Sequence, residues 1–156
     1  WRSALRRIDA LARDLRDHLP DDVRLLVTGD HGMIDSPQER WVVAEDVPGL
    51  VDDLTLLAGE GRFRQLYCAP RHVDAVATRW RNVLGDRAWV VTRDEAVASG
   101  WFGPLEQRMA DRWGDVLVVM RDDWAVMTRR QPKEFGLVGM HGSLTDFEMR
   151  VPVLVG

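Results

Sequence analysis

The sequence predicts an α/β fold, in which a sheet flanked by helices carries an inserted α+β subdomain. An amphipathic helix followed by a short apolar strand opens the chain, another apolar strand closes it, and strands and helices alternate between them. A helix that feeds a buried strand is half of a βαβ unit, the repeating element of parallel sheets that are covered by helices.

The framing elements lie at the two ends of the chain. Ser3 is placed to cap the first helix and Pro20 to end it. The run 23–28 is predicted as a strand buried on both faces, and 151–155 as the final strand, where Pro152 marks a strand start or a sheet edge. The first helix is predicted by apolar residues at helical spacing: Leu5, Ile8, Leu11, Ala12, Leu15 and Leu19.

The middle of the chain is predicted to be a separate α+β unit. In order, the sequence predicts a short turn opened by a capping box at 36–39, strands at 54–58 and 62–69, a helix at 73–84, a strand at 89–91, a helix opened by a capping box at 92–95, a helix at 105–113, and a hairpin of 116–120 with 124–127. We therefore expect residues 1–53 and 128–156 to form parts of one core and residues 54–127 to be inserted into it.

Composition and charge exclude several classes of protein. The 156 residues are 46% hydrophobic and 29% charged, which is typical of a globular domain. A net charge of −4 argues against a nucleic-acid surface, which favours basic residues. Cys68 is the only cysteine and is expected in the core, so no internal disulfide points to an oxidising compartment. With no signal-like segment and no membrane-length apolar run, we expect a cytoplasmic protein whose chain begins in mid-gene at Trp1.

The first chemical motif follows the first predicted strand. Asp30 and His31 stand between Gly29 and Gly32, past the carboxyl end of the strand, where open α/β sheets bind ligands. An aspartate oxygen and an imidazole nitrogen can share one zinc ion if the chain bends there, and the glycines permit the bend. The alternative is that Asp30 caps the next turn and His31 is an ordinary loop histidine.

The second motif is the His-Gly-Ser sequence at 141–143, shortly before the final strand. His141 is a candidate metal ligand, and a turn histidine is the alternative. Thr145 to Glu148 forms a third capping box, so we assign Asp146 and Glu148 to a helix N-terminus rather than to metal binding.

Together the two motifs resemble the type I phosphodiesterase/nucleotide pyrophosphatase branch of the alkaline phosphatase superfamily. The resemblance rests on Asp-His-Gly-Met at 30–33 and on His-Gly-Ser at 141–143, about 110 residues later. It implies that this chain is the C-terminal part of an alkaline-phosphatase-like sheet. It also implies two zinc ions, one held by Asp30 and His31 and the other by His141, and a nucleotide-like phosphoester substrate.

The resemblance further implies residues before the Asp-His motif: another aspartate, an Asp-x-x-x-His pair, and a threonine or serine nucleophile. Asp14 and His18 have this pair's spacing, but they lie on a charged helix face and are interpreted as a solvated helix-end pair. We therefore expect the nucleophile upstream of Trp1, in a missing N-terminal part of the same protein. The chain alone is expected to be inactive and to hold zinc weakly or not at all.

Two other classes of function stay open from the sequence. A phosphomutase, phosphonate hydrolase or sulfatase of the same superfamily would use similar metal ligands. A non-catalytic binding module would carry decayed motifs and recognise a partner through the inserted subdomain.

Several other residues have two interpretations. Arg62, Arg64 and Arg71 are expected on the solvent face of a strand, with phosphate binding as the alternative. His72 is expected at the surface. Among the aromatic residues, Trp80, Trp89 and Trp113 fit core or interface positions, and Trp41 or Trp101-Phe102 are candidates for a substrate pocket.

Overall fold

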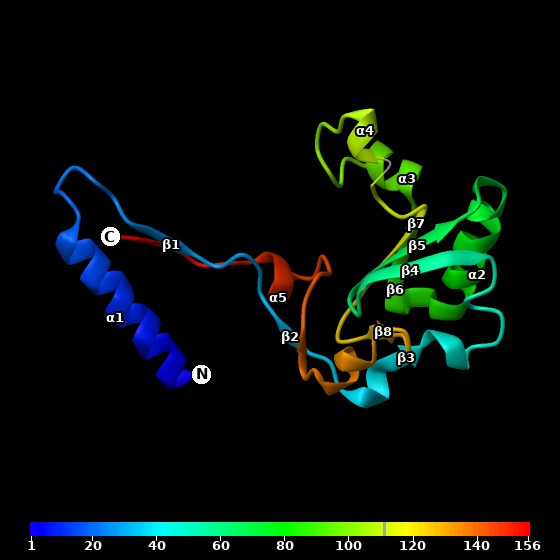
Figure 1. Cartoon of the computed structure of the whole chain (residues 1–156), viewed down its shortest axis with the longest axis horizontal. Helices are drawn as coiled ribbons and strands as arrows, with labels where there is room; N and C mark the ends of the chain where they lie inside the picture. Colours follow the sequence, from blue (N-terminus) through cyan, green and yellow to red (C-terminus); the bar gives the residue numbers. More distant parts are fainter. Residues whose placement is uncertain (111) are drawn as a thin grey trace.

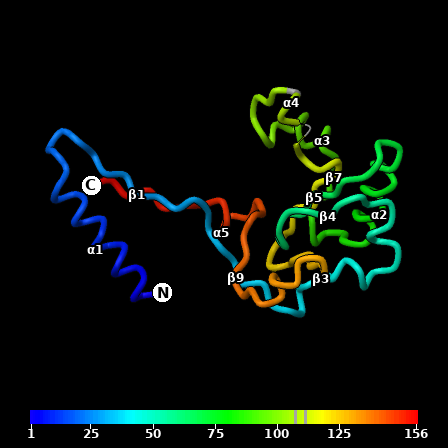
Figure 2. Tube along the Cα trace, viewed as in Figure 1, coloured from blue at the N-terminus to red at the C-terminus, as the bar shows by residue number. Residues whose placement is uncertain are grey.

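The computed structural model describes residues 1–110 and 112–156 and confirms the α/β class. Figure 1 shows a compact body built on one sheet and an extended segment that holds both ends of the chain. The tube in Figure 2 shows the N-terminal and C-terminal segments running side by side through that extension, with α5 (Asp146–Met149) where it meets the body.

The body is organised by a four-stranded sheet in the order β4-β5-β7-β6, with antiparallel neighbours throughout. The strands are β4 (Leu54–Glu60), β5 (Phe63–Cys68), β7 (Val116–Met120) and β6 (Ala88–Thr92). All five residues of β7 are buried, so both faces of the sheet are covered at this central strand. The predicted strands at 54–58, 62–69 and 89–91 are confirmed.

Helix α2 (Val73–Leu84) contacts β6 and β7 and supplies the centre of the core. Its indole at Trp80 is fully buried, and the Nε1–H donates a 2.9 Å hydrogen bond to the carbonyl of Leu50. Cys68 lies in the same cluster, as predicted. Val42 and Ala44 also belong to it, so the segment before β4 packs on the body. The division at residues 53 and 128 stays a prediction.

The predicted hairpin of 116–120 with 124–127 is wrong. β7 already pairs with β5 on one side and with β6 on the other, so it has no free edge for a third strand. The chain turns after β7, and β8 (Ala125–Met127) instead pairs in parallel with β3 (Trp41–Val43).

The extended segment differs from the buried parallel strand that the sequence predicts. β1 (Leu26–Thr28) pairs antiparallel with β10 (Val153–Val155), and Leu26 is 64% exposed. A two-stranded ribbon cannot bury both faces of its strands, and α1 (Arg2–His18) contributes no buried residue. The predicted Ser3 cap is also wrong, because α1 begins at Arg2.

Of the three predicted capping boxes only one forms. Thr92 and Glu95 bond reciprocally at the start of α3 (Arg93–Ala98). The Ser36 hydroxyl instead donates to the carbonyl of Asp123, and Thr145 donates to the carboxylate of Glu148, so neither caps a backbone amide.

The remaining elements are short. The helix predicted at 105–113 is represented by α4 (Gln107–Ala110), and Asp111 within that prediction lies outside the described residues. Across the part of the chain that the structure describes, none of the helices has the length and apolar character needed to cross a membrane. The remaining short elements are the strands β2 (Ile34–Asp35) and β9 (Gly139–Met140), and 3₁₀ turns at Gln38–Arg40, Ala44–Asp46, Pro70–His72, Gly85–Arg87 and Pro132–Gly136.

The indole of Trp80 offers a direct test of the core. Trp80→Phe should lower the free energy of unfolding by about 1–3 kcal/mol, because the buried carbonyl of Leu50 loses its donor. Trp89→Phe, at a position 36% exposed, is the matched control and should change much less. Urea unfolding followed by circular dichroism measures both; equal losses would show that the hydrogen bond is not the cause.

Candidate metal-binding site

The two predicted histidines lie face to face. The imidazole rings of His31 and His141 are stacked, with centroids 3.7 Å apart and planes inclined by 14°. The short antiparallel pair β2–β9 brings them together, since Ile34 is opposite Met140. The residues just before β2 therefore lie beside the residue just after β9.

Asp30 lies beside His31. Its Oδ2 is 3.7 Å from the His31 Nε2, and its side chain is 90% exposed. The other ring nitrogen of His31, Nδ1, is 2.6 Å from the carbonyl oxygen of Gly32. A carbonyl only accepts, so Nδ1 carries the proton and Nε2 keeps the lone pair that a metal needs, which is how zinc-binding histidines are usually oriented.

The charge of Asp30 favours the same chemistry. A hydrogen bond from its own backbone amide, and then the neighbouring His31, hold the pKa of Asp30 below its ordinary value. The carboxylate is therefore ionised at neutral pH and can act as an oxygen ligand.

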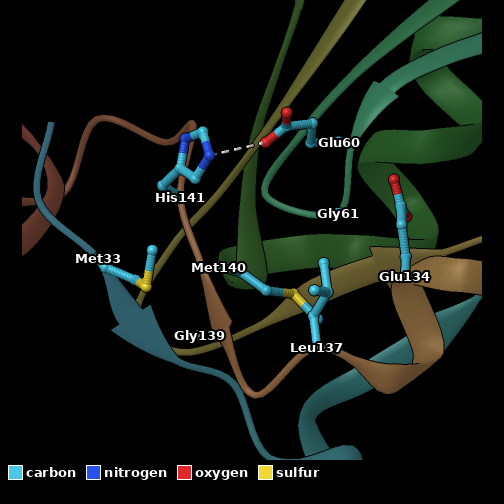
Figure 3. A pocket seen from close by; sticks show the side chains of 8 residues that line it. All are labelled: Met33, Glu60, Gly61, Glu134, Leu137, Gly139, Met140 and His141. Carbon is cyan, nitrogen blue, oxygen red and sulfur yellow. Dashed lines mark ion pairs between the residues drawn. The ribbon is translucent and has the colours of Figure 1, made fainter. Parts of the chain in front are cut away.

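His141 faces a residue that sequence analysis did not select. Its Nε2 is 3.3 Å from Oε2 of Glu60, at the end of β4, as the dashed line in Figure 3 shows. Both side chains are accessible, with exposures of 34% for His141 and 60% for Glu60. Nothing in the sequence around Glu60 marks it, because only the tertiary packing of the chain brings it to His141.

These residues fit zinc by type, but only as part of a larger ligand set. Imidazole nitrogen and carboxylate oxygen are both zinc donors, and catalytic zinc takes three protein ligands. Among residues 1–110 and 112–156, no group of three or more His, Cys, Asp or Glu side chains is arranged to hold a metal ion. Asp30, His31 and His141 therefore form no complete zinc site by themselves among the described residues.

A buried ion pair supports the two loops. Arg62 and Glu148 are 0% and 1% exposed, with Nε–Oε1 and Nη2–Oε2 distances of 3.0 and 2.6 Å. The remaining Arg62 nitrogen, Nη1, donates to the carbonyl of Trp124. Glu148 lies in the first turn of α5, as predicted, and in addition it pairs with an arginine that directly precedes β5.

Glu148 contacts both histidine-bearing loops. Its Oε1 accepts a 3.0 Å hydrogen bond from the amide of Ser143, two residues after His141. Its backbone carbonyl accepts a 2.7 Å bond from the amide of Gly32, one residue after His31. A side chain at Gly32 would place its Cβ 1.8 Å from the carbonyl oxygen of Phe147, so this approach requires glycine.

The ionisation of Glu148 reflects competing effects. Burial by itself raises the pKa of this carboxyl, but the hydrogen bonds from Arg62, Thr145 and the Ser143 amide outweigh burial and lower it. Glu148 is therefore a carboxylate at neutral pH, and the charge of Arg62 is neutralised where water cannot reach it.

Neither interpretation of the arginines at 62 and 64 is correct. Like Arg62, Arg64 is fully buried; it donates to the carbonyls of Val126 and Gly59 and pairs with Glu134. Neither is on a solvent face or free to bind phosphate. Arg71, by contrast, is exposed.

The other singled-out residues lie away from the stacked rings. His18 and Asp14 are an exposed pair, 78% and 72% accessible, as the interpretation of a solvated helix end requires. His72 is partly buried beside Asp53, with 3.5 Å between the imidazole Nδ1 and Oδ1. Trp41 donates its indole N–H to the carbonyl of Ser36 and packs against Phe135.

The side chain of His141 borders three hollows. The first, of about 300 Å³, is shown in Figure 3 and is lined by Met33, Glu60 and Met140 among others. A second, of about 240 Å³, contains Asp30 and His31. A third, of about 400 Å³, has an aromatic wall that includes Phe102 and Trp113. The side chain of His141 is therefore accessible from more than one direction.

The arrangement is a ligand-accessible site on an α/β fold that presents imidazole and carboxylate groups. The chain belongs to the type I phosphodiesterase/nucleotide pyrophosphatase family, whose sequence profile matches residues 1–144. The family predicted from the two motifs is thereby confirmed. No curated protein matches the chain by similarity.

Solved structures share the fold at low sequence identity. Human ectonucleotide pyrophosphatase/phosphodiesterase 5 has a TM-score of 0.69 at 19% identity, over 96% of this chain and 38% of its own. An inactive murine form of the same protein, in complex with AMP, has a TM-score of 0.64 at 18% identity, over 90% and 35%. Phosphonoacetate hydrolase from Sinorhizobium meliloti, in complex with phosphonoacetate, has a TM-score of 0.58 at 20% identity, over 86% and 36%. This chain thus spans well under half of each.

Removing one member of the buried ion pair should be costly. Arg62→Met should lower the free energy of unfolding by about 3–5 kcal/mol, because the Glu148 carboxylate is left buried without its partner. The double variant Arg62→Met with Glu148→Leu should recover part of that loss. Arg150→Met, which breaks the exposed pair with Asp146, is the control and should cost less than about 1 kcal/mol.

Chemical denaturation of the three variants and the parent protein measures these changes. If Arg62→Met and Arg150→Met proved equally mild, the pair would not be what holds the two loops together.

Proposed function

We propose that this chain forms one side of a two-metal centre that hydrolyses the phosphoester bond of a nucleotide-like substrate. Asp30 and His31 would hold one divalent ion, most suitably zinc, and His141 would hold the second. The observation that carries the proposal is the stacking of two imidazoles from loops far apart in the chain, at 3.7 Å.

The geometry of the rings favours two ions over one. An imidazole lone pair lies in the plane of its ring, and these two planes are inclined by only 14°. Nitrogens on nearly parallel rings point along separate lines, so each ring suits its own ion. Two-metal hydrolase sites place their ions about 3.5–4 Å apart, close to the separation of these rings.

When bound, such ions stabilise the attacking and leaving oxygens of a phosphoryl transfer. The residues of this chain would hold and orient the site. Gly32 fixes the tautomer of His31 through its carbonyl, Asp30 contributes negative charge, and Glu148 holds both loops through Gly32 and Ser143.

The nucleophile is proposed to come from elsewhere in a longer protein. The two hydroxyls next to the histidine motifs are unsuited to attack. Ser143 is buried and donates its hydroxyl to the carbonyl of Met120, and Thr28 donates to the carbonyl of Gly29. The chain also spans only 38% of the human structure that shares its fold, so further ligands can come from another segment.

A phosphonate hydrolase is the second candidate. The bacterial phosphonoacetate hydrolase shares the fold at a TM-score of 0.58. Phosphodiester hydrolysis is favoured because the matching family is a phosphodiesterase family and because the aromatic hollow beside His141 suits a larger substrate than phosphonoacetate.

The histidines can be tested in the full-length protein. His31→Ala and His141→Ala should each reduce zinc-dependent hydrolysis of bis(4-nitrophenyl) phosphate by more than about 100-fold, since even outer-shell changes at metal sites cost roughly 10- to 100-fold. His18→Ala, at an exposed position, is the matched control and should retain full activity. Zinc content per protein gives a second readout. Full activity of both histidine variants would remove the proposal, and faster turnover of phosphonoacetate would favour the second candidate.

The isolated 156-residue chain makes a separate prediction. It should show no turnover of bis(4-nitrophenyl) phosphate, and its zinc affinity should be far below that of the full-length protein, because its described residues contain no three-ligand cluster. Equilibrium dialysis with zinc and a colorimetric assay measure these quantities. Metal-dependent turnover by the chain alone would place the nucleophile within residues 1–156.

A further inference from the structure

The carboxylate of Glu60 is carried by a tight hairpin. Glu60 ends β4 and lies opposite Phe63, the first residue of β5. The hairpin is held to the body because the Gly61 carbonyl accepts a 2.8 Å hydrogen bond from the amide of Val126. At Gly59, where φ is +82°, a Cβ would lie 2.2 Å from the carbonyl oxygen of Phe63, so the turn requires glycine. The backbone at Glu60 therefore has little freedom to move.

The buried ion pair joins this hairpin to the loop of His141. Glu60 lies two residues before Arg62, and His141 lies two residues before Ser143. The carboxylate of Glu148 accepts hydrogen bonds from the Arg62 guanidinium and from the Ser143 amide. One buried carboxylate thus determines where both Glu60 and His141 stand, and the fold itself brings their side chains together.

The separation of these two side chains matches that of two ligands on one metal ion. Oε2 of Glu60 is 3.3 Å from Nε2 of His141, along the dashed line in Figure 3. Zinc binds carboxylate oxygen at about 2.0–2.2 Å and imidazole nitrogen at about 2.0–2.1 Å, so two such ligands at a tetrahedral angle are about 3.3–3.5 Å apart. For Asp30 and His31, the corresponding distance between Oδ2 and Nε2 is 3.7 Å. Each stacked imidazole therefore has a carboxylate at a spacing close to that of ligands that share an ion.

The charges around the stacked rings favour the same role. A divalent ion is the largest local charge of its site, so an anionic ligand beside it is stabilising. The carboxylate of Glu148 is already neutralised by Arg62 and is buried. Glu60 is 60% exposed, and an ion pair with a protonated His141 at such exposure would contribute little to stability.

We propose that Glu60 is a ligand of the second ion, which it shares with His141. This assignment rests on the proposed function, because it needs the ion that His141 is proposed to hold. Asp30 with His31 and Glu60 with His141 then form two matched pairs, each with one oxygen and one nitrogen donor. A catalytic zinc takes three protein ligands, so each pair needs one further ligand from outside these four residues.

Zinc binding to the full-length protein tests the assignment. Glu60→Gln keeps the size of the side chain but removes its charge, and it should weaken the binding of one of the two zinc ions by more than about 100-fold, since outer-shell changes alone cost roughly 10- to 100-fold. Glu39→Gln, the same change at another exposed glutamate, is the matched control and should leave both affinities unchanged. Competition with a chromophoric chelator measures both affinities. Unchanged zinc affinity in Glu60→Gln would overturn the assignment.

Double variants show which ion Glu60 binds. Glu60→Gln combined with His141→Ala should retain as much zinc as His141→Ala alone, because both changes remove the same ion. Glu60→Gln combined with Asp30→Asn should lose both ions, because these changes act on different ones. Losses that add with His141→Ala but not with Asp30→Asn would place Glu60 on the wrong ion and overturn the assignment.

A second substitution at the same position separates metal binding from a role in charge or structure. Glu60→His replaces one zinc donor by another, so it should bind the second zinc ion more tightly than Glu60→Gln does. If the two variants bound zinc equally weakly, Glu60 would act through its charge or its packing and the assignment would fail.

The outcomes also separate this assignment from the proposed function. If Glu60→Gln keeps its zinc affinity while His31→Ala and His141→Ala abolish hydrolysis, the metal centre stands and Glu60 is not a ligand. If hydrolysis survives in both histidine variants but the binding of one zinc ion depends on Glu60 and His141 together, the proposed function fails and the ligand assignment stands.

Discussion

The geometry of the candidate site depends on the buried ion pair between Arg62 and Glu148. Removing two charges from water is expensive, and a pair this deep persists only when its polar atoms are satisfied. Here the guanidinium meets the carboxylate at two points and also the carbonyl of Trp124, while the carboxylate accepts from Ser143 and Thr145. A shift of Glu148 would leave the buried charge of Arg62 without its partner. The two histidine-bearing loops attached to it are therefore held in one arrangement.

The local signals in the sequence were sufficient for much of the fold. Periodicity and short-range hydrogen bonds, which depend on residues close together in the sequence, predict much of the body. They predict helix α2, the strands β4 to β6 and the capping box at Thr92. The parallel pairing of β3 with β8 cannot be predicted from neighbouring residues, because it depends on both edges of β7 being paired with other strands. The exposure of β1 follows from its having only one neighbouring strand.

The candidate site divides in the same way. Asp30, His31 and His141 are found from sequence because glycines beside metal-binding residue types form short motifs. Arg62 is missed because its partner lies 86 residues away, and a polar strand residue normally faces solvent. Glu60 is missed for the same reason, since only tertiary packing brings it to His141. Candidate ligands are thus visible in short motifs, whereas the residues that hold them in place are visible only after the chain has folded.

The region where β5 begins links the support of the site to the aromatic hollow. Arg62 and Arg64 point inward and pair with acidic residues, and Phe63 between them points outward to the aromatic wall. Because strand side chains alternate, moving one of these residues along the strand would move the others with it. The support for the histidine loops and the wall of the hollow are consequently set at a fixed separation by one rigid segment.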